Sequence, residues 1–199
     1  MSNLFYRGQF NSYKVNNINK SLESVTESYT FDSFYHKRKT KVFVSHKHDD
    51  LEDLKGVIGF LEEEFKVDVY IDSQDKTMPK ITSGITAKRI KERIKKCDKF
   101  ILLATNGAIE SKWCNWELGF GDANKFEKNN LALFPMCENS YSKSSYKGNE
   151  YLGIYPHIVY RDGTTTYSDG RRIPKGYYVR SKNNEDGFNI QPLVEWLES

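Results

Sequence analysis

The chain has 199 residues, of which 38% are hydrophobic and 14% aromatic, and its formal net charge is +3. This length fits one domain, and the mild charge, without a recognised basic and aromatic motif, argues against nucleic acid as a partner. The three cysteines form no Cys-x-x-Cys pair, which argues against a disulfide framework or a structural zinc site and favours a reducing compartment.

The first fifteen residues lack the apolar stretch of a signal peptide, and no apolar run reaches the roughly 20 residues of a membrane span. We therefore expect a cytoplasmic protein without a membrane partner. Residues 1–38 are predicted to be an N-terminal extension, and residues 39–199 the main domain. A helix over about residues 16–30, packed on that domain, is indicated by apolar residues at helical spacing: Ile18, Leu22, Val25 and Tyr29.

From residue 41 onward, strand and helix patterns alternate. Strands are predicted at residues 42–44, 67–71, 100–104, 131–135 and 157–160. Helices are predicted at residues 51–65, 88–96, 113–125 and 188–197. This alternation predicts a parallel sheet with helices on both faces. Residues 138–155 are expected to form a loop, and an insert at about 161–181 to hold a hairpin around Asp169 and Gly170.

The most informative segment is residues 111–118, directly after the buried strand at 100–104. Trp113 and Glu117 are four residues apart, so they share one helix face. Because ligands of open α/β sheets bind at the carboxyl ends of the strands, this pair places an indole and a carboxylate at a ligand-binding edge. The pair is suited to hold a flat ring and to stabilise a cation next to it. The alternatives are an ordinary surface glutamate and a core tryptophan.

Other polar residues are expected at the same edge. Ser45 and His46 follow the first strand, where backbone amides and a helix N-terminus can hold a phosphate or a ribose. Asp49 is a candidate helix cap that can also contact a ligand. Ser83 and Ile85 stand where a long loop leads into the next helix, and this loop either closes over a ligand or is a solvated connector.

Two further chemistries are considered and not adopted. His46 and His48 have no third ligand at a recognised spacing, so no metal site is expected. Cys114 has no histidine placed to activate it and is interpreted as a packing residue. Trp116 and Phe120 are also assigned to packing.

Four blocks of this chain, in order, resemble the TIR (Toll/interleukin-1 receptor) domain in its bacterial form. The blocks are residues 41–49, 69–84, 100–104 and 111–118, the last being similar to the family's Trp-x-x-x-Glu segment. The resemblance covers about residues 39–160, with the last helix included. It implies a flavodoxin-like, three-layer α/β fold whose five-stranded parallel sheet has the order 2-1-3-4-5.

The resemblance also implies one of two functions. Some TIR domains hydrolyse or cyclise NAD, whereas others only assemble signalling complexes. In the catalytic members the motif's glutamate, here Glu117, is essential. Free-standing members occur in Thoeris-type anti-phage systems, where a cyclic ADP-ribose-type signal activates an effector. The resemblance therefore implies NAD as substrate, no separate cofactor, a homo-oligomer formed by TIR–TIR contacts, and a downstream effector.

One carboxylate is enough for the chemistry expected of Glu117. Nicotinamide leaves a cationic pyridinium as a neutral molecule, so the general acid of ordinary glycoside hydrolysis is not needed. The carboxylate stabilises the oxocarbenium-like charge on the ribose. Two rival functions stay open, a non-catalytic interaction module and a nucleoside deoxyribosyltransferase-like enzyme. A phosphate-accepting receiver domain is disfavoured, because Thr105 and Asn106 follow the strand where an aspartate is needed.

Overall fold

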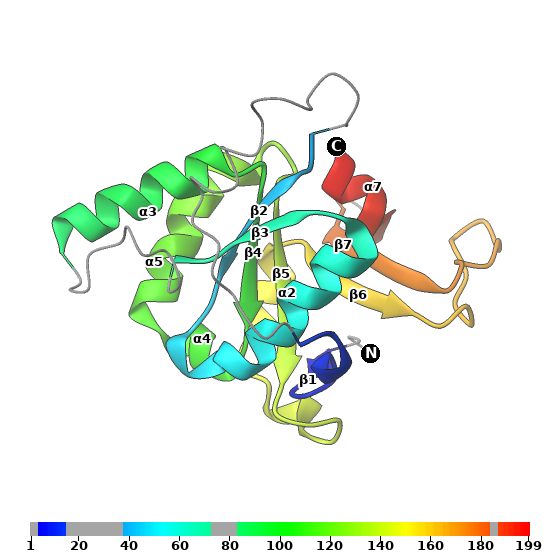
Figure 1. Ribbon diagram of the computed structural model, residues 1–199. Helices are drawn as coiled ribbons and strands as arrows, with labels where there is room; N and C mark the ends of the chain where they lie inside the picture. Colours follow the sequence, from blue (N-terminus) through cyan, green and yellow to red (C-terminus); the bar gives the residue numbers. More distant parts are fainter. Residues whose placement is uncertain (1–3, 15–37, 73–82, 184–186) are drawn as a thin grey trace.

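The computed structural model describes residues 4–14, 38–72, 83–183 and 187–199. Its centre is an eight-stranded sheet with helices on both faces (Figure 1). Five strands are parallel to one another and pair in the order β3-β2-β4-β5-β6. They are β2 (Lys41–Ser45), β3 (Asp68–Tyr70), β4 (Lys99–Ala104), β5 (Leu131–Cys137) and β6 (His157–Arg161). The predicted order of the parallel strands is confirmed.

Three further strands extend the sheet beyond the prediction. β7 (Gly176–Lys182) pairs antiparallel with β6, and β8 (Phe188–Pro192) pairs antiparallel with β7. β1 (Phe5–Tyr6) pairs with the end of β5. The helix predicted over residues 188–197 is therefore wrong in its first half. Five register pairs with β7 hold that half as a strand, and α7 (Leu193–Glu198) begins only after Pro192.

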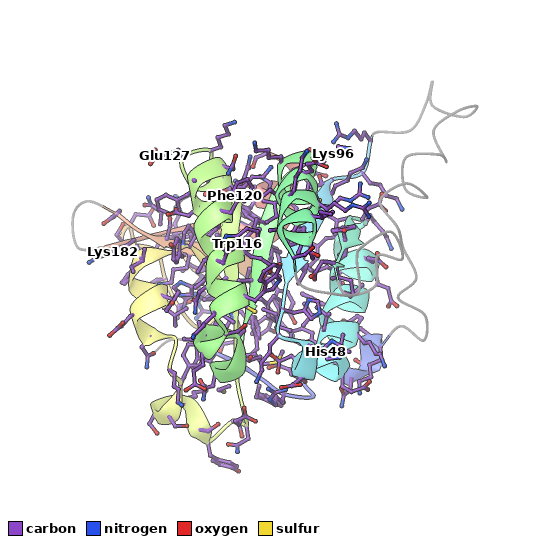
Figure 2. All side chains as sticks on the ribbon, turned by 90° about the vertical axis from the view of Figure 1, so that its left-hand side faces the viewer. His48, Lys96, Trp116, Phe120, Glu127 and Lys182 are labelled. Carbon is purple, nitrogen blue, oxygen red and sulfur yellow. The ribbon has the colours of Figure 1, made fainter. Side chains whose placement is uncertain are left out.

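The helices form two layers. One face of the sheet carries α2 (Leu51–Phe65), α7 and the 3-10 turn η1 (Asn11–Tyr13). The other face carries α3 (Gly84–Lys96), α4 (Asn106–Glu110), α5 (Lys112–Gly121) and α6 (Asn149–Ile154). Figure 2 looks onto this second layer, where Trp116 and Phe120 mark α5 and Lys96 marks the end of α3. None of the helices in the described ranges is long and apolar enough to cross a membrane.

The central strands explain why the sheet is flanked on both sides. All residues of β2 and β4 are buried, so alternate side chains enter two separate cores. Val42 and Val44 pack in the core under α2, whereas Phe43 packs in the core under α3 and α5. A strand buried on both faces has a continuous apolar sequence, which is why these strands were predictable.

The N-terminal segment is part of the main core. Phe5 stacks on Phe134 of β5 with ring centroids 4.6 Å apart. Arg7 binds Asp50 at 2.5 Å and Asp53 at 2.6 Å, which ties the segment to the start of α2. The helix predicted for residues 16–30 lies outside the described residues.

Two loop expectations had different outcomes. The predicted hairpin is present, because Thr166 and Arg172 form an antiparallel bridge around a turn in which Gly170 has φ +84°. Residues 138–155 are not a plain loop, since they contain a 3-10 turn, η5 (Ser142–Ser145), and α6. Tyr146 anchors this region by donating a hydrogen bond of 2.8 Å to the Ala104 carbonyl, a tertiary contact that the polar sequence does not reveal.

Candidate active site

The candidate site begins with a hydrogen bond between the first strand and α5. Ser45 is the last residue of β2, and its hydroxyl donates to Oε2 of Glu117 at 2.5 Å. Both residues are buried, with exposed fractions of 0% for Ser45 and 1% for Glu117. The structure therefore brings two predicted site residues together at the carboxyl edge of the sheet.

Local caps position Glu117. The Ser111 side chain accepts a hydrogen bond from the Cys114 N–H at 3.3 Å and so fixes the start of α5. Asn115 binds the Ile109 carbonyl at 2.8 Å and accepts from the Tyr151 hydroxyl at 2.8 Å. These bonds join α5 to α4 and α6, so the glutamate sits on a rigid element.

The environment of Glu117 favours its protonated form. Burial raises the pKa of its carboxyl well above the ordinary value, and the negative charge of Asp72 raises it further. The Ser45 hydroxyl and the Trp113 indole lower this pKa but do not outweigh burial. The second carboxyl oxygen, Oε1, is buried without a hydrogen-bond partner in the described residues. One oxygen of the carboxyl is thus fixed, and the other is buried with unused hydrogen-bonding capacity.

His46 lies next to Ser45 and is 6% exposed. Its Nδ1 is 3.4 Å from the Val44 carbonyl. Burial lowers the pKa of this imidazole below its ordinary value, while the charge of Asp72 opposes the shift. The ring is therefore neutral at physiological pH, suited to donate or accept a hydrogen bond rather than to bind a phosphate by charge.

Asp72 is the site residue that sequence reasoning did not select. It follows β3, and β3 pairs with β2, so it lies near the edge where Ser45 and His46 stand. Its charge acts on both Glu117 and His46. The sequence does show that Asp72 stands at the end of the second predicted strand. It does not show the effect of Asp72 on the pKa values of Glu117 and His46, which depends on burial.

Trp113 is half-buried on the first turn of α5 and stacks on Trp116, with centroids 4.9 Å and planes 27° apart. The row continues to Phe120, and Lys91 of α3 lies 5.5 Å from the Trp116 ring centroid. Trp113 therefore forms the N-terminal end of an aromatic row along α5. This placement permits a flat ligand to extend the stack.

Three predicted residues lie apart from this cluster. The Asp49 side chain is 72% exposed and pairs with Lys47 at 3.0 Å, and it does not cap α2. Its neighbour Asp50 is buried instead, and the carboxylate of Asp50 accepts a hydrogen bond from the Thr105 hydroxyl at 2.6 Å. Ser83 caps α3 by accepting from the Thr86 N–H at 3.3 Å, and Ile85 is 63% exposed. Residues 73–82 of the predicted loop lie outside the described residues.

The remaining candidates for chemistry are limited. Burial raises the pKa of the Cys114 thiol to about 11, which makes it a poor nucleophile at neutral pH. Within the described ranges no group of three or more His, Cys, Asp or Glu side chains is placed to hold a metal ion. What the cluster offers is the buried carboxyl of Glu117, the nearby carboxylate of Asp72, the Ser45 hydroxyl, a neutral imidazole and an aromatic surface.

A family profile described as the TIR domain matches residues 42–172. The chain belongs to the TIR-domain family. Over 186 aligned residues this TIR protein is 30% identical to a protein of Bacillus cereus (strain MSX-D12) named "Probable 3' cyclic ADP-D-ribose synthase ThsB'". The alignment covers 83% of the TIR protein and 93% of that relative. The similarity thus extends well beyond the motif around Glu117.

Proposed function

We propose that this TIR protein cleaves the nicotinamide–ribose bond of NAD and releases a cyclic ADP-ribose-type signal in bacterial anti-phage defence. The observation that carries the proposal is the buried carboxyl of Glu117, fixed by Ser45 at one oxygen and unpartnered at the other. The similarity to a protein named as a cyclic ADP-ribose synthase supports it.

The proposed reaction uses the charge of NAD itself. The bond between ribose C1′ and the pyridinium nitrogen breaks, and its electron pair leaves with neutral nicotinamide. The ionised Glu117 stabilises the positive charge that develops on the ribose. A hydroxyl group of the same molecule then bonds to C1′ and loses its proton, which gives a cyclic product, whereas water in its place gives ADP-ribose.

Trp113, Ser45 and His46 supply positioning in this proposal. Trp113 stacks on the nicotinamide or adenine ring, extending the aromatic row of α5. Ser45 orients Glu117, and His46 contacts the ribose as a neutral hydrogen-bonding group. Asp49 in η2 (His48–Asp50) and Ser83 and Ile85 at the start of α3 stay as predicted contacts.

Binding of the cationic ring and ionisation of Glu117 assist each other. A positive charge near a buried carboxyl lowers its pKa, so NAD promotes the active form of its own catalyst. Glu117 is only 1% exposed in this structure, so access for NAD requires the surrounding segments to move. We propose that assembly into a TIR–TIR homo-oligomer opens and completes the site. The protein acts in the cytoplasm without a cofactor, and its product reaches a downstream effector.

Product analysis tests this proposal. The purified protein is incubated with NAD alone, with a crowding agent and with phage lysate, and the products are identified by mass spectrometry. A cyclic ADP-ribose isomer together with nicotinamide supports the proposal. If no product forms under any of the three conditions, an interaction module is favoured. A separate assay that shows base exchange on deoxynucleosides would favour a deoxyribosyltransferase-like enzyme.

A further inference from the structure

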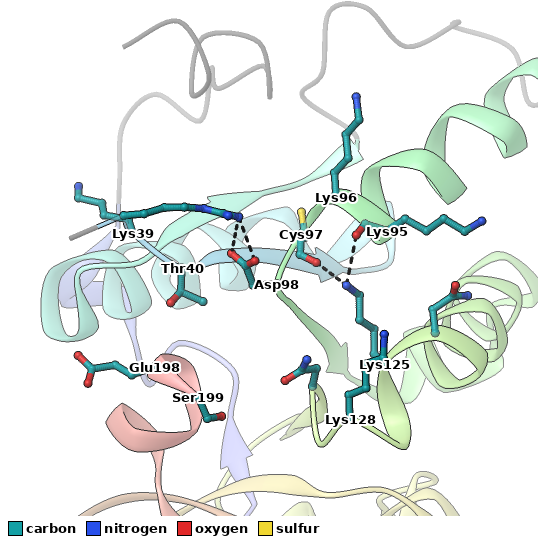
Figure 3. A pocket seen from close by; sticks show the side chains of 13 residues that line it. Lys39, Thr40, Lys95, Lys96, Cys97, Asp98, Lys125, Lys128, Glu198 and Ser199 are labelled. Atoms are coloured by element: carbon teal, nitrogen blue, oxygen red, sulfur yellow. Dashed lines mark hydrogen bonds and ion pairs between the residues drawn. The ribbon is translucent and has the colours of Figure 1, made fainter. Parts of the chain in front are cut away.

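A cavity lies beside the start of β2, whereas Ser45 at the end of that strand belongs to the Glu117 site (Figure 3). Its volume is about 410 Å³, and its lining includes the end of α3, the segment after α5 and the end of α7. β2 begins at Lys41 beside this cavity and ends at Ser45, so the two sites are separated by about 13 Å of strand. Six basic and two acidic side chains line the cavity. This is a concentrated positive charge in a chain whose net charge is only +3.

Two buried ammonium groups at this cavity are satisfied by neutral acceptors alone. Lys125 is 8% exposed and donates to the carbonyls of Lys95 and Cys97, as Figure 3 shows. Lys99 is 0% exposed and donates to Asn130 Oδ1 at 2.5 Å and Ser199 Oγ at 2.9 Å. Its two acceptor residues themselves line the cavity.

The charge of Asp98 raises the pKa of both ammonium groups, but this carboxylate already has other partners. Asp98 is bound by Arg38 at 3.0 and 3.2 Å and by the Lys41 N–H at 2.9 Å. In the part of the chain that the structure describes, neither Lys99 nor Lys125 forms an ion pair. Burying a charge without a partner of opposite sign is unfavourable. Burial accordingly lowers the pKa of Lys99 to about 8 and lowers that of Lys125 as well.

The rim of the cavity adds two exposed cations. Lys96 and Lys128 line the cavity, and neither has a hydrogen bond or an ion pair among the described residues. An anion bound in the cavity would supply the charge that the buried ammonium groups lack. Ligand pockets for small molecules measure about 300–1,000 Å³, so a volume near the lower limit suits a small phosphate compound better than a protein segment.

We propose that this cavity binds a small phosphate-bearing anion, held by Lys96 and Lys128 at the rim and by the charges of Lys99 and Lys125 below. The site goes beyond the proposed function and does not depend on Glu117. Inorganic pyrophosphate and adenosine diphosphate share the required chemistry, and they serve as separate probes.

Isothermal titration calorimetry of the full chain tests the site. Pyrophosphate is expected to bind saturably at one site, and the double variant K96Q/K128Q to bind at least tenfold more weakly. K175Q/K182Q is the matched control, since it removes the same charge from exposed lysines that do not line the cavity, and it is expected to stay within twofold. If adenosine diphosphate binds more tightly than pyrophosphate, with the same dependence on Lys96 and Lys128, the site recognises a nucleotide. If the two ligands bind equally well, the site recognises the phosphoryl groups alone. Both support the proposal.

A second readout follows Lys99 directly. NMR titration of its side chain is expected to show a pKa that rises from about 8 when the protein is saturated with pyrophosphate. The same concentration added to K96Q/K128Q is expected to leave the titration unchanged. The proposal would be overturned by any of three results. These are no saturable binding of pyrophosphate, an equal loss of affinity in both double variants, or a Lys99 pKa that does not change when pyrophosphate is added.

Discussion

The Ser45 hydroxyl donates to Oε2 of Glu117 at 2.5 Å, which joins the end of β2 to the second turn of α5. This bond holds one oxygen of the carboxyl, while Oε1 is unpartnered among the described residues. Since hydrogen bonding to the ionised form lowers a carboxyl pKa, Ser45 opposes the effect of burial. The pair therefore sets both the position and the protonation of the proposed catalytic group.

Ser45→Ala is expected to raise the pKa of Glu117 further and to reduce NAD cleavage at pH 7 by roughly 10- to 100-fold, because a hydrogen bond to a charged group contributes about 1.5–3 kcal/mol. The acid limb of the pH–rate profile moves to higher pH. Ser111→Ala is the control, since it removes only the cap of α5 and costs about 1 kcal/mol of stability. Its profile keeps the wild-type midpoint. An unshifted profile in Ser45→Ala would contradict the assigned role.

Asp72→Asn is expected to have the opposite effect. Loss of the negative charge lowers the pKa of Glu117, so activity persists to lower pH than in the wild type. The same change lowers the pKa of His46 further, which NMR titration of the imidazole measures. Asp68→Asn, at the other end of β3, should move neither value. If His46 and Glu117 respond no more to Asp72→Asn than to Asp68→Asn, Asp72 does not belong to the site.

Glu117→Gln is expected to stabilise the fold at alkaline pH. The folded pKa is raised above the unfolded value, so the carboxyl's favourable contribution is present at low pH and is lost as the pH rises through the folded pKa. Glutamine stays neutral, and the Tm of the variant at pH 8 should exceed that of the wild type by about 2–4 °C, on the order of 1 kcal/mol. At pH 5 the two should agree more closely.

The control for this measurement is Glu63→Gln, an exposed glutamate on α2, which should change stability by less than about 0.5 kcal/mol at either pH. A Glu117→Gln variant that is less stable than the wild type at pH 8 would mean that the buried carboxylate is well compensated in the folded protein. A Glu117 pKa raised by burial would then be wrong.

Arg7→Gln is expected to destabilise the protein by about 2–4 kcal/mol, because it leaves the carboxylate of Asp50, 1% exposed, without its cation. Chemical denaturation measures this change. Lys14→Gln removes an ion pair with Glu52, whose side chain is 68% exposed, and should cost less than about 1 kcal/mol. Equal effects of the two variants would show that the N-terminal segment is not anchored through Arg7.

Much of the central fold was predictable because β2, β4 and β5 are buried along their whole length. The five parallel strands have continuous apolar sequences, and their alternation with helices fixes the sheet class. β1 has only two residues, too few for a pattern. In β8, Ile190 has helical spacing to Leu193 and Leu197, so pairing with β7 decided the structure against the local pattern.

The site was predictable as far as position along strands and helices determines it. Ser45, His46 and Glu117 were placed at the carboxyl edge of the sheet, and the structure puts them there. Asp49 and Asp50 are neighbours in one 3-10 turn, η2 (His48–Asp50), yet one is exposed and the other buried. The partners that bury Asp50 come from the distant Arg7 and Thr105, which no local pattern indicates.

Release of nicotinamide from NAD by the wild type and by Glu117→Gln, under the same activating condition, tests the central claim most directly. The account predicts a loss of about 100-fold or more in rate, because glutamine keeps the size and the hydrogen bond to Ser45 but cannot stabilise a positive ribose. A variant that folds and releases nicotinamide at the wild-type rate would contradict it.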